Sequence, residues 1–234
     1  MNPLWNQLAG QAGLEITQLQ LAELVRYLDL LSAANERMNL TRIVDRASAE
    51  LQHVADALTL LEYLPRGEIR IADIGSGGGV PAIPLAIVRS DARFTLIEST
   101  KKKAVFLRET AQKLELKNIQ VLDERVEDVG QSNLREMVDA VTVRAVAEMG
   151  WLAEWGLPLL KRGGKLLAMK GPKAEEELGR TGRVISRLGG AMPGVKKIEI
   201  PELNGHVIVV IEKVRSTPKD YPRAATMAKG KMLQ

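Results

Sequence analysis

Hydrophobic and polar residues follow two different periods along this chain. Apolar positions recur at helical spacing over 14–38 and again from about 46 to 63, which predicts two helices. After residue 65 the pattern changes to short apolar runs separated mostly by helical segments such as 101–115; the runs are 69–74, 93–98, 119–122, 138–143 and 165–169. Strands that alternate with helices predict an α/β fold with a parallel sheet covered on both faces.

The end of the chain departs from this alternation. Two β-rich runs, 195–200 and 206–213, predict a final hairpin that adds an antiparallel strand to the sheet. Residues 215–234 contain five basic residues and one acid, which predicts a mobile basic tail or an extended arm. We therefore expect a helical extension over 1–65, a main domain over 66–214 and a tail over 215–234. Within the extension, Thr17 and Gln20 predict a capping box.

The most specific local pattern is a glycine-rich turn between two predicted strands. Residues 71–79 read Ile-Ala-Asp-Ile-Gly-Ser-Gly-Gly-Gly, and Glu98 closes the next apolar run. Such a turn brings backbone close to a ligand, and an acid at this place suits the two hydroxyls of a ribose. The third glycine of a dinucleotide fingerprint would fall on Val80, and Asp73 is a poor neighbour for a pyrophosphate. A cationic nucleoside such as S-adenosylmethionine fits better, although a turn that binds nothing is the alternative.

Composition narrows the classes of function. The chain has no cysteine, which excludes disulfides, iron–sulfur clusters and a thiolate nucleophile, and we expect no metal site. No apolar run approaches 18 residues and no signal pattern is present, so we expect a cytoplasmic protein without a membrane partner. The net charge of +4 permits a nucleic-acid partner. Aromatic residues make up only 3% of the chain, which disfavours a surface that stacks bases.

Several ordered motifs carry a resemblance that runs nearly from end to end. They are Asn39-Leu40-Thr41, His53 with Asp56, the glycine segment 73–85, the helix residues Lys102, Lys103, Phe106 and Leu107, Arg125-Val126-Glu127, Arg144-Ala145, the segment 159–164, Met169-Lys170-Gly171 and the tail segment 217–223. Together they resemble the bacterial RsmG (GidB) family, which methylates N7 of a guanine in 16S ribosomal RNA. Ala57 departs from the family, which usually has a serine there.

The resemblance implies a fold, a cofactor and a partner. The fold would be a Rossmann-like class I S-adenosylmethionine-dependent methyltransferase with a mostly parallel seven-stranded sheet. The substrate would be 16S rRNA or the small ribosomal subunit, with the target in the helix 18 loop near the decoding site, and the enzyme would be a monomer. The implied cofactor-binding residues are Gly75, Val80, Glu98, Ser99, Thr100, Val126, Glu127 and Arg144.

Arg144 is the expected catalytic residue, because it would align the base or the donor. Candidate substrate-binding residues are Asn39, His53, Lys101, Lys170 and Arg223. Several of these candidate residues also have a structural interpretation. Arg144 could pair with Asp73 or Glu98, Asn39 could form a turn, and His53 could serve only the structure. Two other functions stay open, namely the same fold acting on a protein or small molecule, and a nucleotide-binding module without transferase activity.

Guanine N7 has an in-plane lone pair and no proton at neutral pH, so its methylation needs alignment and desolvation and no general base. The chain contains two histidines and no Ser-His-Asp spacing, in agreement with this requirement. A C5-pyrimidine methyltransferase would need a cysteine. An adenine-N6 enzyme would show an Asn/Asp-Pro-Pro-aromatic motif, which is absent.

Overall fold

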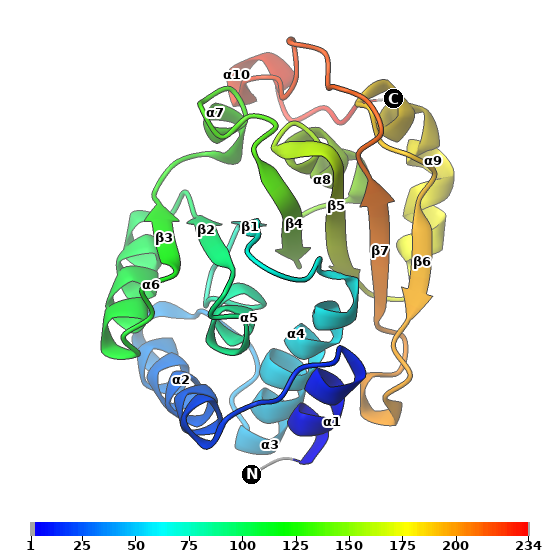
Figure 1. The fold of residues 1–234 in the computed structure, drawn as a ribbon. Helices are drawn as coiled ribbons and strands as arrows, with labels where there is room; N and C mark the ends of the chain where they lie inside the picture. The colour runs from blue at the N-terminus through cyan, green and yellow to red at the C-terminus, as the bar shows by residue number, and fades with distance from the viewer. Residues whose placement is uncertain (1–2, 234) are drawn as a thin grey trace.

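The computed structural model describes residues 3–233 and is organised around a seven-stranded sheet (Figure 1). The strands lie in the order β3-β2-β1-β4-β5-β7-β6. Their bounds are β1 Arg70–Ile74, β2 Arg93–Ile97, β3 Ile119–Leu122, β4 Val138–Arg144, β5 Leu160–Lys170, β6 Gly194–Lys197 and β7 Val207–Glu212. The first five strands pair in parallel. The apolar runs therefore identified every strand, and only β5 is markedly longer than expected.

The final hairpin is confirmed. Strand β7 is antiparallel to both β5 and β6. Because β7 runs against the other central strands, its first residues lie beside the last residues of β5, where Val207 is paired with Lys170. The turn that precedes β7 is thereby brought to the carboxyl edge of the parallel strands.

Two helices of the N-terminal region differ in how well the sequence predicted them. Helix α2 (Gln18–Met38) begins at the predicted capping box, in which the Thr17 side chain accepts from Gln20 N and the Gln20 side chain accepts from Thr17 N. Helix α1 (Pro3–Gln11) was not predicted. It is short for an isolated helix and is fixed by tertiary contacts, since Trp5 is fully buried and donates to the Glu50 carbonyl.

The segment from 46 to 63 is helical, but the expectation of one regular helix was wrong. It consists of α3 (Arg46–Ala49), the π-helix η1 (Glu50–Ala55), α4 (Asp56–Leu58) and the 3-10 helix η2 (Thr59–Tyr63). The backbone N–H of Asp56 donates to the Leu51 carbonyl, five residues back. His53 and Asp56 both face the interior, where each is at most 4% exposed.

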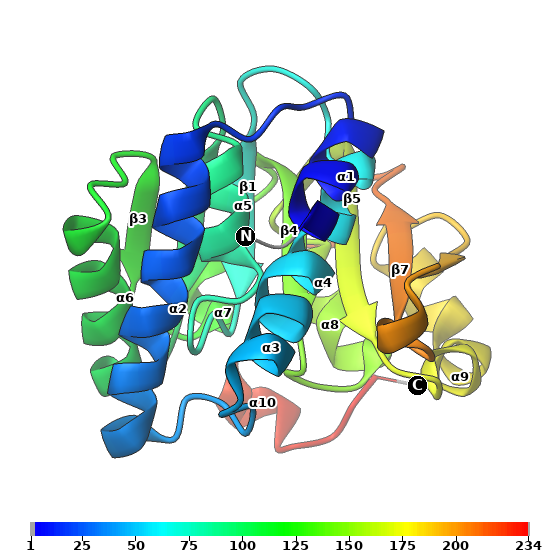
Figure 2. The same ribbon diagram turned by 90° about the horizontal axis from the view of Figure 1, so that it is seen from below.

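Helices cover both faces of the sheet, and each face has its own hydrophobic cluster. One cluster joins α1, α2, α4, α5 (Ala82–Val88) and α6 (Lys101–Lys113) to one side of the strands. The other joins α8 (Met149–Gly156) and α9 (Ala174–Arg187) to the opposite side. Figure 2 shows α2, α4 and α5 gathered on one side. Ile71 and Ala72 fall in different clusters, as expected for adjacent residues of a strand buried on both faces.

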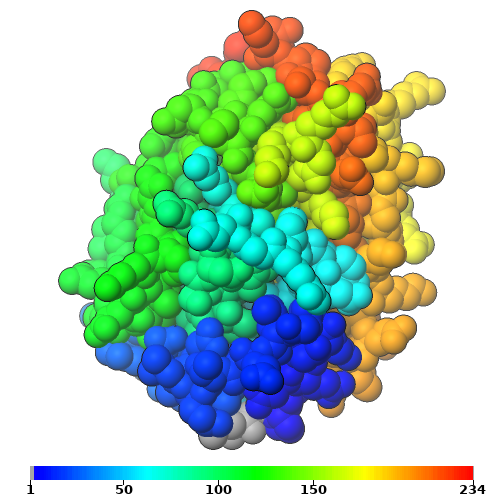
Figure 3. Space-filling model, in the orientation of Figure 1, coloured from blue at the N-terminus to red at the C-terminus, as the bar shows by residue number. Residues whose placement is uncertain are grey.

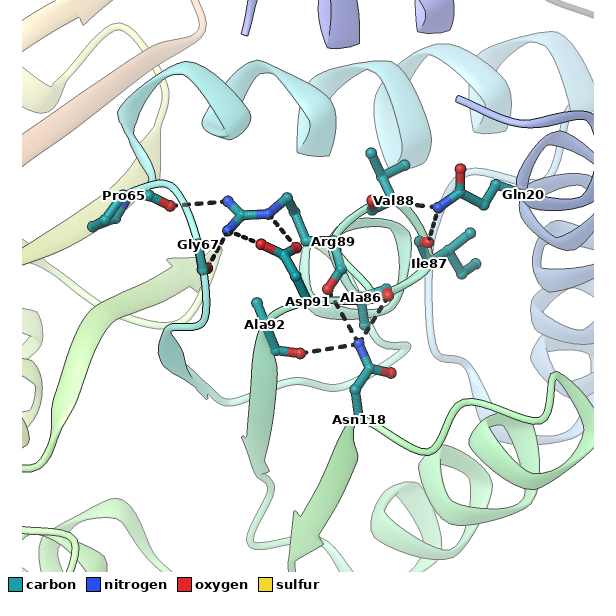
Figure 4. A network of polar contacts seen from close by, with 10 residues as sticks. All are labelled: Gln20, Pro65, Gly67, Ala86, Ile87, Val88, Arg89, Asp91, Ala92 and Asn118. Atoms are coloured by element: carbon teal, nitrogen blue, oxygen red, sulfur yellow. Dashed lines mark hydrogen bonds and ion pairs between the residues drawn. The ribbon is translucent and has the colours of Figure 1, made fainter. Parts of the chain in front are cut away.

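A polar network closes the end of α5 (Figure 4). The last carbonyls of a helix have no partner within it and need donors from elsewhere. The Asn118 amide donates to the carbonyls of Ala86, Arg89 and Ala92, while Gln20 Nε2 donates to those of Ile87 and Val88. The network therefore fixes α2, α5 and the start of β3 relative to one another, at the edge opposite the predicted site.

The tail was expected to be mobile or to form an extended arm, whereas the structure holds residues 215–233 by side-chain contacts against the body of the protein. The Arg135 guanidinium donates to the carbonyls of Thr217, Pro218 and Tyr221. Arg223 pairs with Glu154 of α8, and the short helix α10 (Ala225–Ala228) follows. The tail thus packs onto the body of the protein. In the described part of the chain, no helix is both long and apolar enough to span a membrane.

Candidate functional site

The glycine turn between β1 and α5 is built from residues with positive φ. Gly75, Gly77 and Gly79 have φ values of 66°, 53° and 93°, a region that L side chains rarely adopt. A Cβ on Gly79 would lie 2.4 Å from Ile83 Cδ1, and a Cβ on Gly75 would lie 2.7 Å from Val146 Cγ2. The turn is therefore packed too closely to accept side chains at these two positions.

Glu98 follows β2 and joins the glycine turn to the next helix. Its carboxylate accepts hydrogen bonds from Gly77 N at 2.9 Å and from Thr100 N at 2.8 Å. Thr100 is the N-cap of α6, so the acid is held by backbone on both sides. Each carboxylate oxygen has a second lone pair that is free to accept from a ribose hydroxyl. The ribose contact itself stays a prediction.

Asp73 lies in β1, two residues before the turn, and is 1% exposed. Its Oδ1 accepts from Thr142 Oγ1 at 2.7 Å, whereas Oδ2 has no hydrogen-bond partner among the described residues. Burial raises the pKa of Asp73 to about 7. A buried carboxylate with an unpaired oxygen is stabilised by a nearby cation and destabilised by a phosphate. The turn and its two acids therefore fit S-adenosylmethionine, which carries an ammonium and a sulfonium, better than a dinucleotide.

The other predicted cofactor residues lie at the same edge. Val126 is buried and Glu127 half-buried in α7 (Val126–Val129), which follows β3. Ser99 is exposed in the loop after β2, and Val80 is a half-buried residue of the glycine turn. These residues and the glycines thus follow three adjacent strands, β1, β2 and β3. Open α/β sheets bind ligands at this edge.

Arg144 is the last residue of β4 and lines a cavity of about 290 Å³. Its Nη1 donates to the Gln52 carbonyl at 2.5 Å, and its Nη2 lies 3.7 Å from Asp56 Oδ2. The ion-pair partner of Arg144 is therefore Asp56, and the pairing with Asp73 or Glu98 that was the alternative interpretation is not formed. The cavity is lined by Gln52, Asp56, Arg144, Ala145, Met169, Lys170, Gly171, His206 and Val207.

Asp56 and His206 were not among the predicted site residues, yet both belong to this cavity. Asp56 is 1% exposed; its Oδ2 lies 3.2 Å from His206 Nδ1, and its Oδ1 has no hydrogen-bond partner in residues 3–233. The hydrogen bond to the Asp56 carboxylate raises the pKa of His206. The His-x-x-Asp pattern singled out Asp56 as a motif residue, but no local signal in the sequence pointed to His206.

Asn39 and His53 line a different cavity, of about 630 Å³, between α2 and the loop that follows it. Asn39 caps α2 in the left-handed conformation with φ 50°, which agrees with a role as turn former. His53 Nε2 lies 3.1 Å from Thr41 Oγ1. Burial lowers the pKa of His53 to about 4, so the ring is neutral at pH 7.

The three basic candidates are in different places. Lys170 ends β5 and lines the Arg144 cavity, but its ammonium already pairs with Glu177 at 2.7 Å. Lys101 is exposed at the first turn of α6. Arg223 is bound to Glu154 and lines neither cavity. The structure thus brings Arg144 and Lys170 together and leaves Lys101 and Arg223 elsewhere.

Solved structures share this fold. A putative S-adenosylmethionine-dependent methyltransferase from Methanococcus maripaludis is similar over 73% of this chain and 90% of its own, with a TM-score of 0.56 and 16% identity. An S-adenosylmethionine-dependent methyltransferase from Aquifex aeolicus matches 71% of this chain and 93% of its own, with a TM-score of 0.53 and 18% identity. The fold is that of the S-adenosylmethionine-dependent methyltransferases, as predicted.

Sequence relatives identify the family. The model of the GidB family, rRNA small subunit methyltransferase G, matches residues 20–204. Ribosomal RNA small subunit methyltransferase G of Lactobacillus johnsonii is 39% identical over 96% of this chain and 97% of its own length. The protein of that name from Roseiflexus castenholzii is 42% identical over 93% of this chain and 94% of its own. The chain belongs to the rRNA small subunit methyltransferase G family.

Proposed function

We propose that this protein transfers a methyl group from S-adenosylmethionine to N7 of a guanine in 16S ribosomal RNA, in the helix 18 loop near the decoding site. It acts as a monomer in the cytoplasm, on 16S rRNA or the small ribosomal subunit. The observation that carries the proposal is the position of Arg144. It ends β4, between the glycine turn and Glu98 on one side and the 290 Å³ cavity on the other. Figure 3 shows the cyan surface of the helical segment around residue 55 next to the yellow-green surface of β5.

The residues at this edge suit alignment rather than proton transfer. S-adenosylmethionine supplies an electrophilic methyl group on a sulfonium. Gly75, Gly77 and Glu98 would hold the donor, and Asp73 would favour its positive charge. Because guanine N7 needs no base, the work of the other residues is to orient the purine and exclude water. Arg144 would donate to O6, which neighbours N7 on the same edge of guanine.

Substitution of Arg144 tests this function. Purified wild-type protein should incorporate labelled methyl groups into small-subunit RNA or particles, and reverse-transcription mapping should locate one N7-methylguanine. Arg144→Ala should slow the reaction on the order of a hundredfold, because misaligned reactants lose about that much. Arg144→Lys should also be slow, since a point charge does not replace a planar fork. Raising the pH should rescue neither variant.

Arg70→Ala is the matched control. Arg70 is an exposed arginine at the start of β1, on the edge opposite the glycine turn, and its loss should leave methyl transfer unchanged. Wild-type turnover by folded Arg144→Ala would contradict the role of Arg144. Methylation of a protein or small molecule in place of RNA, or tight binding of NAD in a calorimetric titration, would contradict the proposed function itself.

A further inference from the structure

A buried carboxylate faces a guanidinium in the 290 Å³ cavity without a close hydrogen bond between them. Asp56 Oδ2 and Arg144 Nη2 are 3.7 Å apart, beyond the usual range for a charge-assisted hydrogen bond. Asp56 Oδ1 has no hydrogen-bond partner within residues 3–233, although the residue is 1% exposed. Leaving a buried acceptor unsatisfied is costly, so a residue in this state in a cavity wall indicates a ligand that donates hydrogen bonds.

The geometry points to Asp56 as the residue that selects guanine, by accepting hydrogen bonds from N1–H and the 2-amino group of the target base. This inference rests on the proposed function and names the part of the site that reads the base. Guanine presents two adjacent donors, N1–H and N2–H, beside the acceptor O6. A carboxylate next to a guanidinium is the complement of that pattern.

The order of the strands supports one orientation of the guanine ring in the site. Around the guanine ring the groups follow in the order N7, O6, N1 and 2-amino. Along the carboxyl edge of the sheet, the glycine turn follows β1, Glu98 follows β2 and Arg144 ends β4. The Asp56 cavity extends over the last residues of β5 and the first residue of β7. A base with O6 toward Arg144 therefore directs N7 toward the donor side and N1 toward Asp56. The order of the groups around the ring thus matches the order of the strands along the edge.

The same carboxylate would discriminate against adenine. Adenine has a lone pair on N1 and no 2-amino group, so its N1 would face the carboxylate with like polarity, and Asp56 would stay buried and unsatisfied. Sites built to hydrogen-bond a substrate discriminate strongly against analogues that lack the partner. Asp56 also stabilises the product electrostatically. The N7 lone pair forms the new N–C bond while the bond between the methyl group and the donor's sulfur breaks and leaves its electron pair on the sulfur. N1–H is retained, and the positive charge passes from the sulfonium to the purine, near an anion.

Inosine isolates the proposed contact, because it keeps N7, O6 and N1–H and lacks only the 2-amino group. We would map the target guanine with wild-type protein, place hypoxanthine at that position in the RNA, and compare kcat/KM for the two RNAs. Wild type should favour guanine by about tenfold or more, the loss expected for one hydrogen bond to a charged group. Asp56→Ala and the near-isosteric Asp56→Asn should bring this ratio close to one.

Glu177→Gln is the matched control. It removes a carboxylate that pairs with Lys170 at the same edge, but Glu177 does not line the cavity. This variant should keep the wild-type preference for guanine. S-adenosylmethionine affinity and thermal unfolding should show that each variant is folded.

The outcomes separate the two proposals. Asp56 variants that are slower on both RNAs, with the guanine preference intact, would overturn the assignment and leave Asp56 as a structural partner of His206. A wild type without preference for guanine over hypoxanthine would overturn it as well. Failure of wild type to methylate small-subunit RNA at all would overturn both the proposed function and this assignment.

Discussion

The pairing of Arg223 with Glu154 predicts that this tail arginine is a structural residue. Glu154 is 1% exposed in α8, and its carboxylate accepts three hydrogen bonds from Arg223, from the backbone N at 3.0 Å and from Nε and Nη2 at 2.8 Å each. The guanidinium also lies over the Trp151 ring, 5.7 Å from its centroid. In Arg223→Ala, two of these hydrogen bonds are lost and the buried carboxylate has no cation beside it.

Removing one partner of a buried ion pair costs roughly 3–5 kcal/mol. The Arg223 side chain is 21% exposed, so we take the lower end, about 3 kcal/mol. For a chain of this length each kcal/mol lowers the melting temperature by roughly 2–4 °C, which gives a decrease of about 6–12 °C. Differential scanning calorimetry of wild type and Arg223→Ala would measure it.

Two further variants make the test specific. Arg223→Ala combined with Glu154→Gln should recover more than half of the lost stability, because the amide carries no charge to leave unpaired. Lys219→Ala removes an exposed tail cation and should change the free energy of unfolding by no more than a typical surface substitution, about 0.5 kcal/mol. An Arg223→Ala protein as stable as Lys219→Ala would refute the reasoning and return Arg223 to the RNA-contact candidates.

Three more predictions concern the glycine turn and the cavity. Glu98→Ala should weaken S-adenosylmethionine binding about tenfold or more in a calorimetric titration, and unchanged affinity would remove Glu98 from the site. Gly79→Ala should lower the melting temperature, because its Cβ would meet Ile83 Cδ1 at 2.4 Å and φ is 93°; an unshifted transition would contradict this. The raised pKa of His206 means that its pairing with Asp56 stabilises the fold fully below about pH 6.5 and less as pH rises through the folded-state pKa. Denaturant titrations should therefore show His206→Asn costing more stability at about pH 6 than at about pH 9, and an equal cost would exclude this linkage.

The features that could be predicted from the sequence are those encoded over a few neighbouring residues. The strands are short apolar runs, and the glycine turn needs particular residues at fixed spacing. The Thr17 capping box is local in the same sense. The π-turn at 50–55 could not be predicted, because the apolar spacing of that segment also fits an α-helix and tertiary contacts decide the hydrogen-bond register.

The cavity residues were harder to predict because only the topology brings them together. Asp56, Arg144 and His206 are separated by 88 and 62 positions in the chain, and each alone has an ordinary structural interpretation. The prediction for the tail was wrong for a related reason. Its basic residues suggested a solvated arm, and nothing in the sequence showed that Glu154, on a helix about seventy residues earlier, is buried and pairs with Arg223.

The reversed direction of β7 has a consequence for how such a site changes over evolutionary time. The connection before β7, including η3 (Pro201–Leu203) and His206, reaches the carboxyl edge only because that strand runs backwards. The residues predicted to bind the methyl donor follow β1, β2 and β3, and the residues that line the cavity follow β4 and β5 or come from η1, α4 and this connection. The two groups meet where Gly75 packs against Val146, so substitutions near this contact affect both, whereas the connection before β7 lies away from it. Substitutions in this connection can therefore reshape the cavity without touching the glycine turn.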